Sequence, residues 1–325
     1  MNAAGRLAAF GAGLVVAFAG AYIAAAGLVP EAAVATWKES STMTDHTALA
    51  QNPAPAAQNR TSMQGLSLDQ YGYELAPVQA PPTASAAGVL SFTILKPDGS
   101  PLIDYATKHD KDLHLIVVRT DGTGFQHTHP TLDRTTGVWS TPWTWPAAGT
   151  YRVFADFAPA DVENAPALTL TRNVQVSGEF TPVVLTTSRT RDQVAGYTVS
   201  LDGQLVAGTT TTLTATVSKN GEAVSTLEPY LGAFGHLVAL RDGDLAYLHV
   251  HPEGPEPAAG QNGGPSIEFA AEAPTAGRYL LYLDFQVEGR VHTATFVVDA
   301  ERGNAASVPA ADTDSPHSNG HTDGH

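Results

Sequence analysis

Two short histidine motifs of the same form occur in this chain. His127-Thr128-His129-Pro130 is followed 122 residues later by His249-Val250-His251-Pro252. A further histidine, His114 in one case and His236 in the other, precedes each motif by 13 residues. Unrelated loops do not share such a register, which indicates a duplicated domain whose copies each kept a three-histidine cluster. Because imidazole is the commonest metal ligand at neutral pH, the pattern predicts metal binding.

The spacing within each motif suits one ion. Alternate residues of a strand face the same side, so His127 and His129 should project together from one face. The proline that follows ends the strand and places the pair at a rim. We expect His114 on the preceding strand, joined by a short hairpin. Cross-strand neighbours lie about 5 Å apart, close enough for three imidazoles to reach one ion at about 2.0–2.1 Å.

Other side chains extend the candidate site. Asp156 and Asp284 recur at equivalent positions, either as ligands or as acceptors that orient an imidazole. The second copy adds His292, which has no counterpart in the first, and the first copy adds His109 in a polar stretch. The candidate metal ligands are therefore His114, His127, His129, Asp156, His236, His249, His251, Asp284 and His292. The alternative is that these histidines only pack and hydrogen-bond within the fold.

The composition limits which metals the chain could bind and which classes of partner it could have. The chain has no cysteine, and its three methionines, at positions 1, 43 and 63, lie outside the repeats, so soft ligands for Cu(I) are missing. Nitrogen and oxygen donors favour Zn(II), Cu(II) or Ni(II). The formal charge of −15, from 17 basic and 32 acidic residues, argues against nucleic acid as a partner.

One enzymatic interpretation competes with simple metal binding. Gly243, His249, His251, Glu256 and Gly263 have the spacing of a first cupin motif. The segment around the glutamate is rich in glycine and proline, which predicts a loop rather than the required strand. The second cupin motif is absent. We also find no phosphate-binding loop, zinc-protease helix or nucleophile elbow, and we expect no enzymatic activity.

The duplication extends well beyond the histidines. An insertion of six residues in the second copy falls in a Gly/Pro-rich stretch, where a loop tolerates a change of length. A period this long predicts two globular domains in tandem rather than a solenoid. The matched stretches are 96–99 with 218–221, 113–119 with 235–241, and 148–157 with 276–285.

The repeats are predicted to be β throughout. Short β-branched or aromatic runs alternate with turn residues, and no helical period is sustained, which favours two tandem immunoglobulin-like antiparallel β-sandwiches. Tyr151 and Tyr279, each just after an Ala-Gly turn, are typical of a tyrosine corner. The predicted strands are 89–95, 113–119, 138–145, 151–157 and 168–176, then 197–201, 210–218, 236–241, 246–250, 267–271, 278–286 and 291–298.

The ends of the chain differ from its body. After Arg6, the uncharged run from Leu7 to Val29 is long enough to span a bilayer, although Ala24 and Ala26 also fit a signal-peptide cleavage site. We favour an uncleaved transmembrane anchor. Whether the segment is an anchor or a cleaved signal peptide, the remainder of the chain is expected to lie outside the cytoplasm. The predicted organisation is an anchor or signal at 1–29, a disordered stalk at 30–64, sandwiches at 65–178 and 179–299, and a disordered His/Asp-rich tail at 300–325.

The repeated runs "LHLIVVRTDGTGFQHTHP…AGTYRVFADF" and "GHLVALRDGDLAYLHVHP…AGRYLLYLDF" resemble a group of actinobacterial secreted or membrane-anchored proteins of heavy-metal-binding type. The architecture is also similar to CopC-type copper-resistance modules, although their N-terminal copper-binding histidine has no equivalent here. The resemblance implies copper and extends to six residues: His114, His127, His129, His236, His249 and His251.

These observations together predict a function. We expect a membrane-anchored or secreted extracytoplasmic protein that binds Cu(II) or Zn(II) and buffers, sequesters or delivers the ion. Its partners would be the metal, the membrane through the N-terminal segment, and an envelope metal transporter or chaperone. The alternatives are a cell-envelope structural or interaction module without metal, and a cupin-like metal-dependent enzyme.

Overall fold

The computed structural model of the chain describes residues 64–248, 250–258 and 260–303. These residues form β-strands, turns and irregular segments, without a helix among them. Accordingly, the described part of the chain offers no helix of the length and apolarity that a membrane crossing needs. The predicted anchor, nearly all of the predicted stalk, most of the predicted tail and His249 lie outside the described residues.

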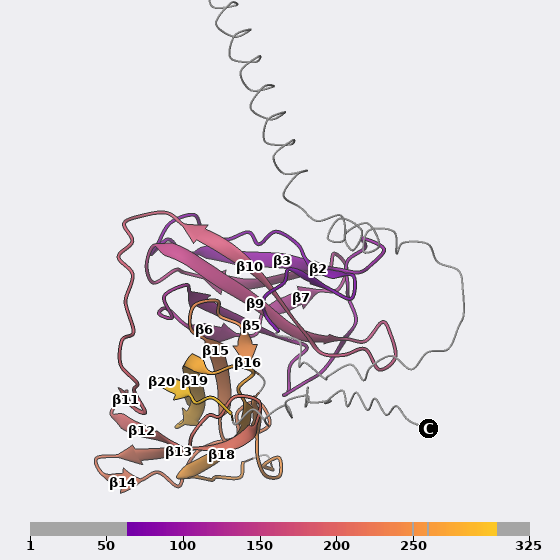
Figure 1. Ribbon diagram of the computed structural model, residues 1–325. Helices are drawn as coiled ribbons and strands as arrows, with labels where there is room; N and C mark the ends of the chain where they lie inside the picture. Colours follow the sequence, from indigo (N-terminus) through magenta and orange to yellow (C-terminus); the bar gives the residue numbers. More distant parts are fainter. Residues whose placement is uncertain (1–63, 249, 259, 304–325) are drawn as a thin grey trace, which may run out of the picture. The chain divides into compact units, whose positions relative to one another are not determined.

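The two repeats contribute ten strands each to the described structure. Figure 1 labels most of these strands along the colours of the sequence. The first repeat contains β1 (Asp69–Gln70), β2 (Tyr73–Leu75), β3 (Gly88–Leu95), β4 (Tyr105–Ala106), β5 (Leu113–Arg119), β6 (Gln126–Thr128), β7 (Thr131–Asp133), β8 (Val138–Trp143), β9 (Gly149–Pro159) and β10 (Leu168–Val176). The second contains β11 (Arg191–Val194), β12 (Tyr197–Asp202), β13 (Thr210–Lys219), β14 (Glu222–Ala223), β15 (His236–Arg241), β16 (Tyr247–Leu248), β17 (Val250–Pro252), β18 (Ser266–Glu272), β19 (Gly277–Val287) and β20 (Arg290–Ala300).

Each repeat is an antiparallel immunoglobulin-like sandwich of two sheets. In the first, the sheet β1-β2-β3-β8-β7 faces the sheet β10-β9-β5-β6, to which β4 is added through β9. In the second, the sheet β11-β12-β13-β18-β17, with β14 beside β13, faces the sheet β16-β15-β19-β20. The strands β5 and β9 of one repeat therefore correspond to β15 and β19 of the other. We call the sheets that contain these four strands the inner sheets, and the other sheet of each sandwich the outer sheet.

The histidine motif lies where the chain passes from one sheet to the other. In the first repeat β6 pairs with β5 of the inner sheet, and β7, which begins just after Pro130, pairs with β8 of the outer sheet. In the second repeat β16 pairs with β15, whereas β17 pairs with β18. The prediction of one continuous strand from 246 to 250 is therefore wrong, because the chain changes sheets within it. In the first repeat β6 ends at Thr128, and in the second β17 ends at Pro252. The rim position expected for the motif stays a prediction.

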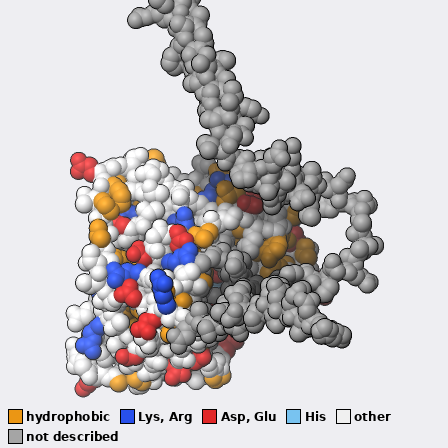
Figure 2. All heavy atoms as spheres, in the orientation of Figure 1, with side chains coloured by type: hydrophobic (Ala, Val, Ile, Leu, Met, Phe, Trp, Pro, Cys, Tyr) orange, Lys and Arg blue, Asp and Glu red, His pale blue; other side chains and the backbone are white. Residues whose placement is uncertain are grey.

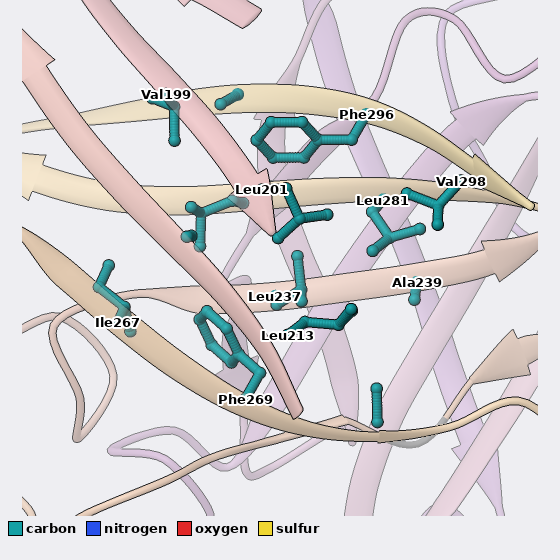
Figure 3. Packing of buried hydrophobic residues seen from close by; sticks show 14 of the residues in the cluster. Val199, Leu201, Leu213, Leu237, Ala239, Ile267, Phe269, Leu281, Phe296 and Val298 are labelled. Atoms are coloured by element: carbon teal, nitrogen blue, oxygen red, sulfur yellow. The ribbon is translucent and has the colours of Figure 1, made fainter. Parts of the chain in front are cut away.

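The inner sheets are buried on both faces. Along β5, Leu113, Leu115 and Val117 pack into the core of the first sandwich, as strand alternation requires. Ile116 and Val118 point the other way, yet they are also fully buried. Such a strand has a continuous run of apolar residues instead of the alternation seen when one face meets water. The second sandwich has its own core, in which Phe269 and other apolar residues of the two sheets interdigitate (Figure 3).

The outward faces of the two inner sheets pack against each other. Tyr282 on β19 also donates a hydrogen bond from its hydroxyl to the carbonyl of Gly122 in the first repeat, at 2.7 Å. The two sandwiches are thus joined through a third apolar core as well as through the chain. Its buried members are Ile116, Val118 and Phe154 from the first repeat and Val238, Leu240, Leu245, Leu280, Tyr282 and Val297 from the second. On the surface shown in Figure 2, by contrast, acidic and basic side chains are interspersed.

Both predicted tyrosine corners are present. The hydroxyl of Tyr151 donates to the carbonyl of Ala147 at 3.0 Å, and that of Tyr279 donates to the carbonyl of Thr275 at 2.8 Å. Both rings are fully buried. Each hydroxyl therefore ties the turn before β9 or β19 to the strand itself, which fixes where the central strand of each inner sheet begins.

Replacing Tyr279 with phenylalanine removes this hydroxyl and keeps the ring. We expect the free energy of unfolding to fall by about 1 kcal/mol, the net contribution of one intramolecular hydrogen bond. Tyr151→Phe should have a similar effect in the first repeat. Urea denaturation of the full chain measures both changes, with Tyr71→Phe, whose side chain is 68% exposed, as the control. Equal stability of all four proteins would show that the corner bonds contribute nothing.

Candidate metal centre

Strand alternation places one histidine of the first repeat inside the interface between the inner sheets. His114 lies on the same face of β5 as Ile116 and Val118, and it is only 3% exposed. On the adjacent strand β6, His127 pairs with Ile116. Continuing this register past Thr128 brings His129 beside His114. The hairpin predicted from the sequence therefore gathers the first three histidines at one end of the apolar interface.

The three imidazoles converge on a common point. His114 Nδ1 lies 3.1 Å from His127 Nε2 and 3.2 Å from His129 Nε2. All three candidate ligand atoms lie within 4.8 Å of one another. We refer to these residues as the histidine trio.

Hydrogen bonds on the far side of two rings determine which nitrogens face inward. His114 Nε2 lies 3.1 Å from the carbonyl oxygen of Lys108, which can only accept, so Nε2 carries the hydrogen. His127 Nδ1 lies 2.7 Å from a carboxylate oxygen of Asp284 and likewise carries a hydrogen. In the neutral rings, both facing nitrogens therefore present lone pairs to each other. A contact of 3.1 Å between them requires a cation in between, either a proton or a metal ion.

Two of the three separations are close to those of a tetrahedral metal site. Two nitrogens bound at about 2.0–2.1 Å to a tetrahedral ion lie about 3.3–3.4 Å apart. The measured distances of 3.1 and 3.2 Å to His114 Nδ1 differ from this by a few tenths of an ångström. At these two contacts an ion would therefore need only small side-chain adjustments.

The acceptor for His127 comes from the other repeat. Asp284 lies on β19, is 2% exposed, and receives a second hydrogen bond from the hydroxyl of Thr293 on β20 at 2.5 Å. Its carboxylate therefore does not face the trio as a ligand. Of the two roles considered for this aspartate, the geometry matches the acceptor that fixes the tautomer and orientation of a ligating imidazole.

A second residue of the other repeat covers the trio. His236, the cross-strand partner of Asp284, has its ring parallel to that of His114 at a centroid distance of 5.4 Å. It also stacks on His127 at 5.0 Å. A stacked ring presents its face, not a nitrogen lone pair, to its neighbours. The structure thus brings His236 to the first repeat's trio, a contact between the copies that the repeat pattern alone does not predict.

Burial keeps these histidines in the neutral form that binds metals. Desolvation, and to a lesser degree the positive charge that His127 can carry, lower the pKa of His114 to about 3. The same two causes lower the pKa of His129 to about 3. The pKa of His236 is lowered well below its ordinary value, again mainly by burial. Near neutral pH all three rings therefore keep an unprotonated nitrogen.

One histidine outside the predicted ligand set also reaches the cluster. The ring of His109 lies 6.1 Å from that of His114 and 5.8 Å from that of His236. It occupies a tight turn in which His109 and Asp110 both have positive φ and the backbones of Lys108 and Lys111 pair. The only sequence signal for this placement was a polar stretch before the strand, which does not specify the turn.

Two other predicted ligands have their side chains engaged elsewhere. Asp156 is the cross-strand partner of His114, but its carboxylate accepts a hydrogen bond from Thr169, and burial raises its pKa to about 6. His292 on β20 packs against the rings of Tyr197 and Phe285, at 5.1 and 5.5 Å.

The rest of the second motif is more exposed or not described. His251 on β17 is exposed. Glu256 lies in an exposed irregular segment after β17, as its composition predicts, and not on the strand that a cupin needs. Because His249 lies outside the described residues, a separate cluster in the second repeat stays a prediction.

The duplicated unit matches a known sequence family. The profile described as "Domain of unknown function (DUF8832)" matches residues 67–175 and again residues 192–302, one match in each repeat. The chain belongs to this family. The description names no activity and no metal, so the resemblance to heavy-metal-binding or CopC-type proteins gains no support from it. No curated protein is similar in sequence to the chain.

Several solved structures resemble parts of the fold at low identity. Domains 4 and 5 of the S-layer protein SbsC share 11% identity over 73% of this chain and 98% of theirs, with a TM-score of 0.21. Invasin, a bacterial integrin-binding protein, shares 12% over 70% and 39%, with a TM-score of 0.19. The fibronectin(III)-like modules of Clostridium thermocellum CbhA share 12% over 70% and 94%, also at 0.19. Scores this low support no statement about what this DUF8832 protein binds.

Acid should destabilise the metal-free protein partly through His114. Its pKa is about 3 in the folded protein against an ordinary value of 6.5. Between these values the unfolded chain binds a proton that the folded chain does not, so the free energy of unfolding falls as the pH is lowered. The contribution of this one group is at most about 1.4 kcal/mol per pH unit.

Denaturant titrations with chelator present, at several pH values below 6.5, measure this slope. A His114→Gln variant should be less stable above that range but should lose stability less steeply on acidification. Identical slopes for the two proteins would contradict the assignment of a depressed pKa to His114.

Proposed function

We propose that this protein binds a divalent metal ion, Cu(II) or Zn(II), through the histidine trio, and that it buffers, sequesters or delivers the ion outside the cytoplasm. The observation that carries the proposal is the convergence of three imidazole nitrogens, two of them 3.1 and 3.2 Å from the third. The lone pairs of His114 Nδ1 and His127 Nε2, 3.1 Å apart, need a positive charge between them. A metal ion supplies it without protonating a buried ring.

The donor set suits these two ions, as it does Ni(II), and disfavours softer ions. Nitrogen ligands suit Zn(II) and Cu(II), whereas the absence of cysteine leaves no thiolate for a softer ion. Copper in particular is suggested by the resemblance to copper-resistance modules alone.

Binding or transfer fits the site better than catalysis. His114 is almost completely buried, and the ring of His236 covers it and His127. A catalytic metal needs an open coordination position that a substrate can reach. The cupin-like alternative has less support, because Glu256 lies outside any described strand. We therefore retain metal binding without catalysis.

The extracytoplasmic location is part of the proposal. It rests on the apolar run from Leu7 to Val29, which would anchor the protein in the membrane or direct its secretion. A natural partner for the metal-loaded form would be an envelope metal transporter or chaperone.

A second candidate function is a cell-envelope structural or interaction module without metal. It is favoured by the hydrogen bonds of the trio, since His114 and His127 each have a partner outside it. With a proton on His127 Nε2, this ring could donate to His114 Nδ1, and the histidines would then serve packing alone. The apolar interface between the repeats would suit a rigid spacer equally well.

Titration calorimetry on the full chain separates the two functions. The tail histidines His317, His321 and His325 should first be replaced by serine, because they can bind metal weakly. We expect one tight site for Zn(II) or Cu(II), lost in His114→Ala and in His127→Ala. His292→Ala, which removes an imidazole outside the trio, is the matched control and should bind normally.

Thermal unfolding gives an independent check. At a free metal concentration about a thousand times the dissociation constant, the free energy of unfolding should rise by about 4 kcal/mol, and chelator should reverse the rise. If the tail-substituted chain takes up no metal and its melting temperature is the same with and without chelator, the metal proposal fails. The envelope module then remains as the candidate function.

A further inference from the structure

The trio and the groups that hold it come from different halves of the chain. All three candidate ligands belong to the first repeat, on β5, on β6 and just beyond β6. The carboxylate that accepts the hydrogen bond from His127 belongs to Asp284, 157 residues later. The ring stacked on His114 and His127 is His236, also of the second repeat. The site is therefore complete only when the two repeats are docked.

Asp284 is held rigidly within its own sandwich. It lies in the middle of β19, which pairs with β15 on one side and with β20 on the other. The hydroxyl of Thr293, its cross-strand partner, donates to one carboxylate oxygen, and His127 contacts the other. Because the side chain of Asp284 is 3% exposed, water cannot take its place while the repeats are packed together.

The docking of the repeats depends on contacts away from the histidines. On β15, Val238 and Leu240 follow His236 on the same face and enter the apolar cluster between the inner sheets. Arg152 also donates to the carbonyl of Asp244 across the interface at 2.5 Å. Packing along this face thus sets the distance between Asp284 and His127.

We infer that the second repeat acts as a positioning partner for the metal site of the first, with Asp284 as the positioning residue, so that metal affinity and repeat docking are coupled. The inference rests on the proposed metal binding. The carboxylate holds His127 with Nε2 directed at the ion and increases the basicity of that nitrogen. By thermodynamic linkage, if docking of the repeats increases the metal affinity by some factor, metal binding increases the docking equilibrium constant by the same factor.

The first repeat supplies a matched comparison. Asp156 faces Thr169 across β9 and β10 just as Asp284 faces Thr293 across β19 and β20. Its carboxylate accepts a hydrogen bond from Thr169 at 3.0 Å. Among the described residues, however, no trio histidine hydrogen-bonds to Asp156. The two aspartates therefore share a local setting and differ in contact with the site.

The first experiment compares Asp284→Asn with Asp156→Asn in the full chain carrying the serine-substituted tail. Zn(II) alone is the probe, in competition with a chelator of known affinity. Asp284→Asn should weaken binding about 10- to 100-fold with one ion still bound, the usual cost of losing such a carboxylate. Asp156→Asn should change the affinity by much less. Equal effects of the two substitutions, or none from Asp284→Asn, would overturn the inference.

A spectroscopic signal distinguishes positioning from a general loss of stability. In the unsubstituted chain without metal, nitrogen chemical shifts should show His127 with hydrogen on Nδ1. In Asp284→Asn this preference should be lost while the rest of the spectrum keeps the folded pattern. An unchanged His127 signal would show that Asp284 does not set the tautomer.

The second experiment disturbs docking without touching the site. Leu240→Arg places a charge in the apolar cluster, four residues along β15 from His236. Thr212→Arg adds the same charge at an exposed position of β13, on the outer sheet, as a control. We expect at least tenfold weaker Zn(II) binding for Leu240→Arg only.

Unchanged affinity in a folded Leu240→Arg protein would overturn the coupling and leave the trio as a site that the first repeat forms alone. If that variant does not fold, the Asp284→Asn comparison decides. Absence of Zn(II) binding in the unsubstituted chain would overturn the proposed function and, with it, this inference.

Discussion

Burial of both faces of the inner sheets is the constraint on which the rest of this structure depends. A strand that meets water on one face can carry polar residues there, but β5 and β15 meet apolar neighbours on both. The same packing removes His114 from water and lowers its pKa. It also excludes water from the Asp284–His127 contact. Fold, electrostatics and candidate site thus have one origin.

Much of the fold could be predicted because its strongest signals are local. The strands β5, β10 and β15 have the predicted bounds, since their apolar runs begin and end at turn residues. The tyrosine corners were recognisable from an Ala-Gly turn before an aromatic residue. Short strands such as β1, β4, β7 and β14 carry too few residues for any pattern, and only their partners define them. The crossing of the chain between sheets at the histidine motif has no local signal either.

The candidate site likewise has one part that the sequence predicts and one part that it does not. The trio follows from hairpin spacing, and the sequence predicts it. The acceptor role was one of two considered for Asp284, but its contact with a histidine of the other repeat, and the stacking of His236 on the trio, do not follow from the sequence. Both depend on how two separate sandwiches pack. The uninterrupted apolar run of β5 was the available signal for that packing: a strand covered on one face only would alternate. An alignment of the two copies makes His114 and His236 equivalent residues. It does not indicate that their rings stack on each other in the folded chain.

The use of equivalent faces also bears on how the chain came to exist. A two-fold homodimer brings the same surface patch of each subunit into contact. Here β5 and β9 of one repeat meet β15 and β19 of the other through corresponding faces. This is the arrangement that fusion of a homodimer into one polypeptide would produce. Within a homodimer every substitution appears twice. Once fused, the halves could diverge, so that one copy kept the histidine trio while the other supplied the groups that hold it.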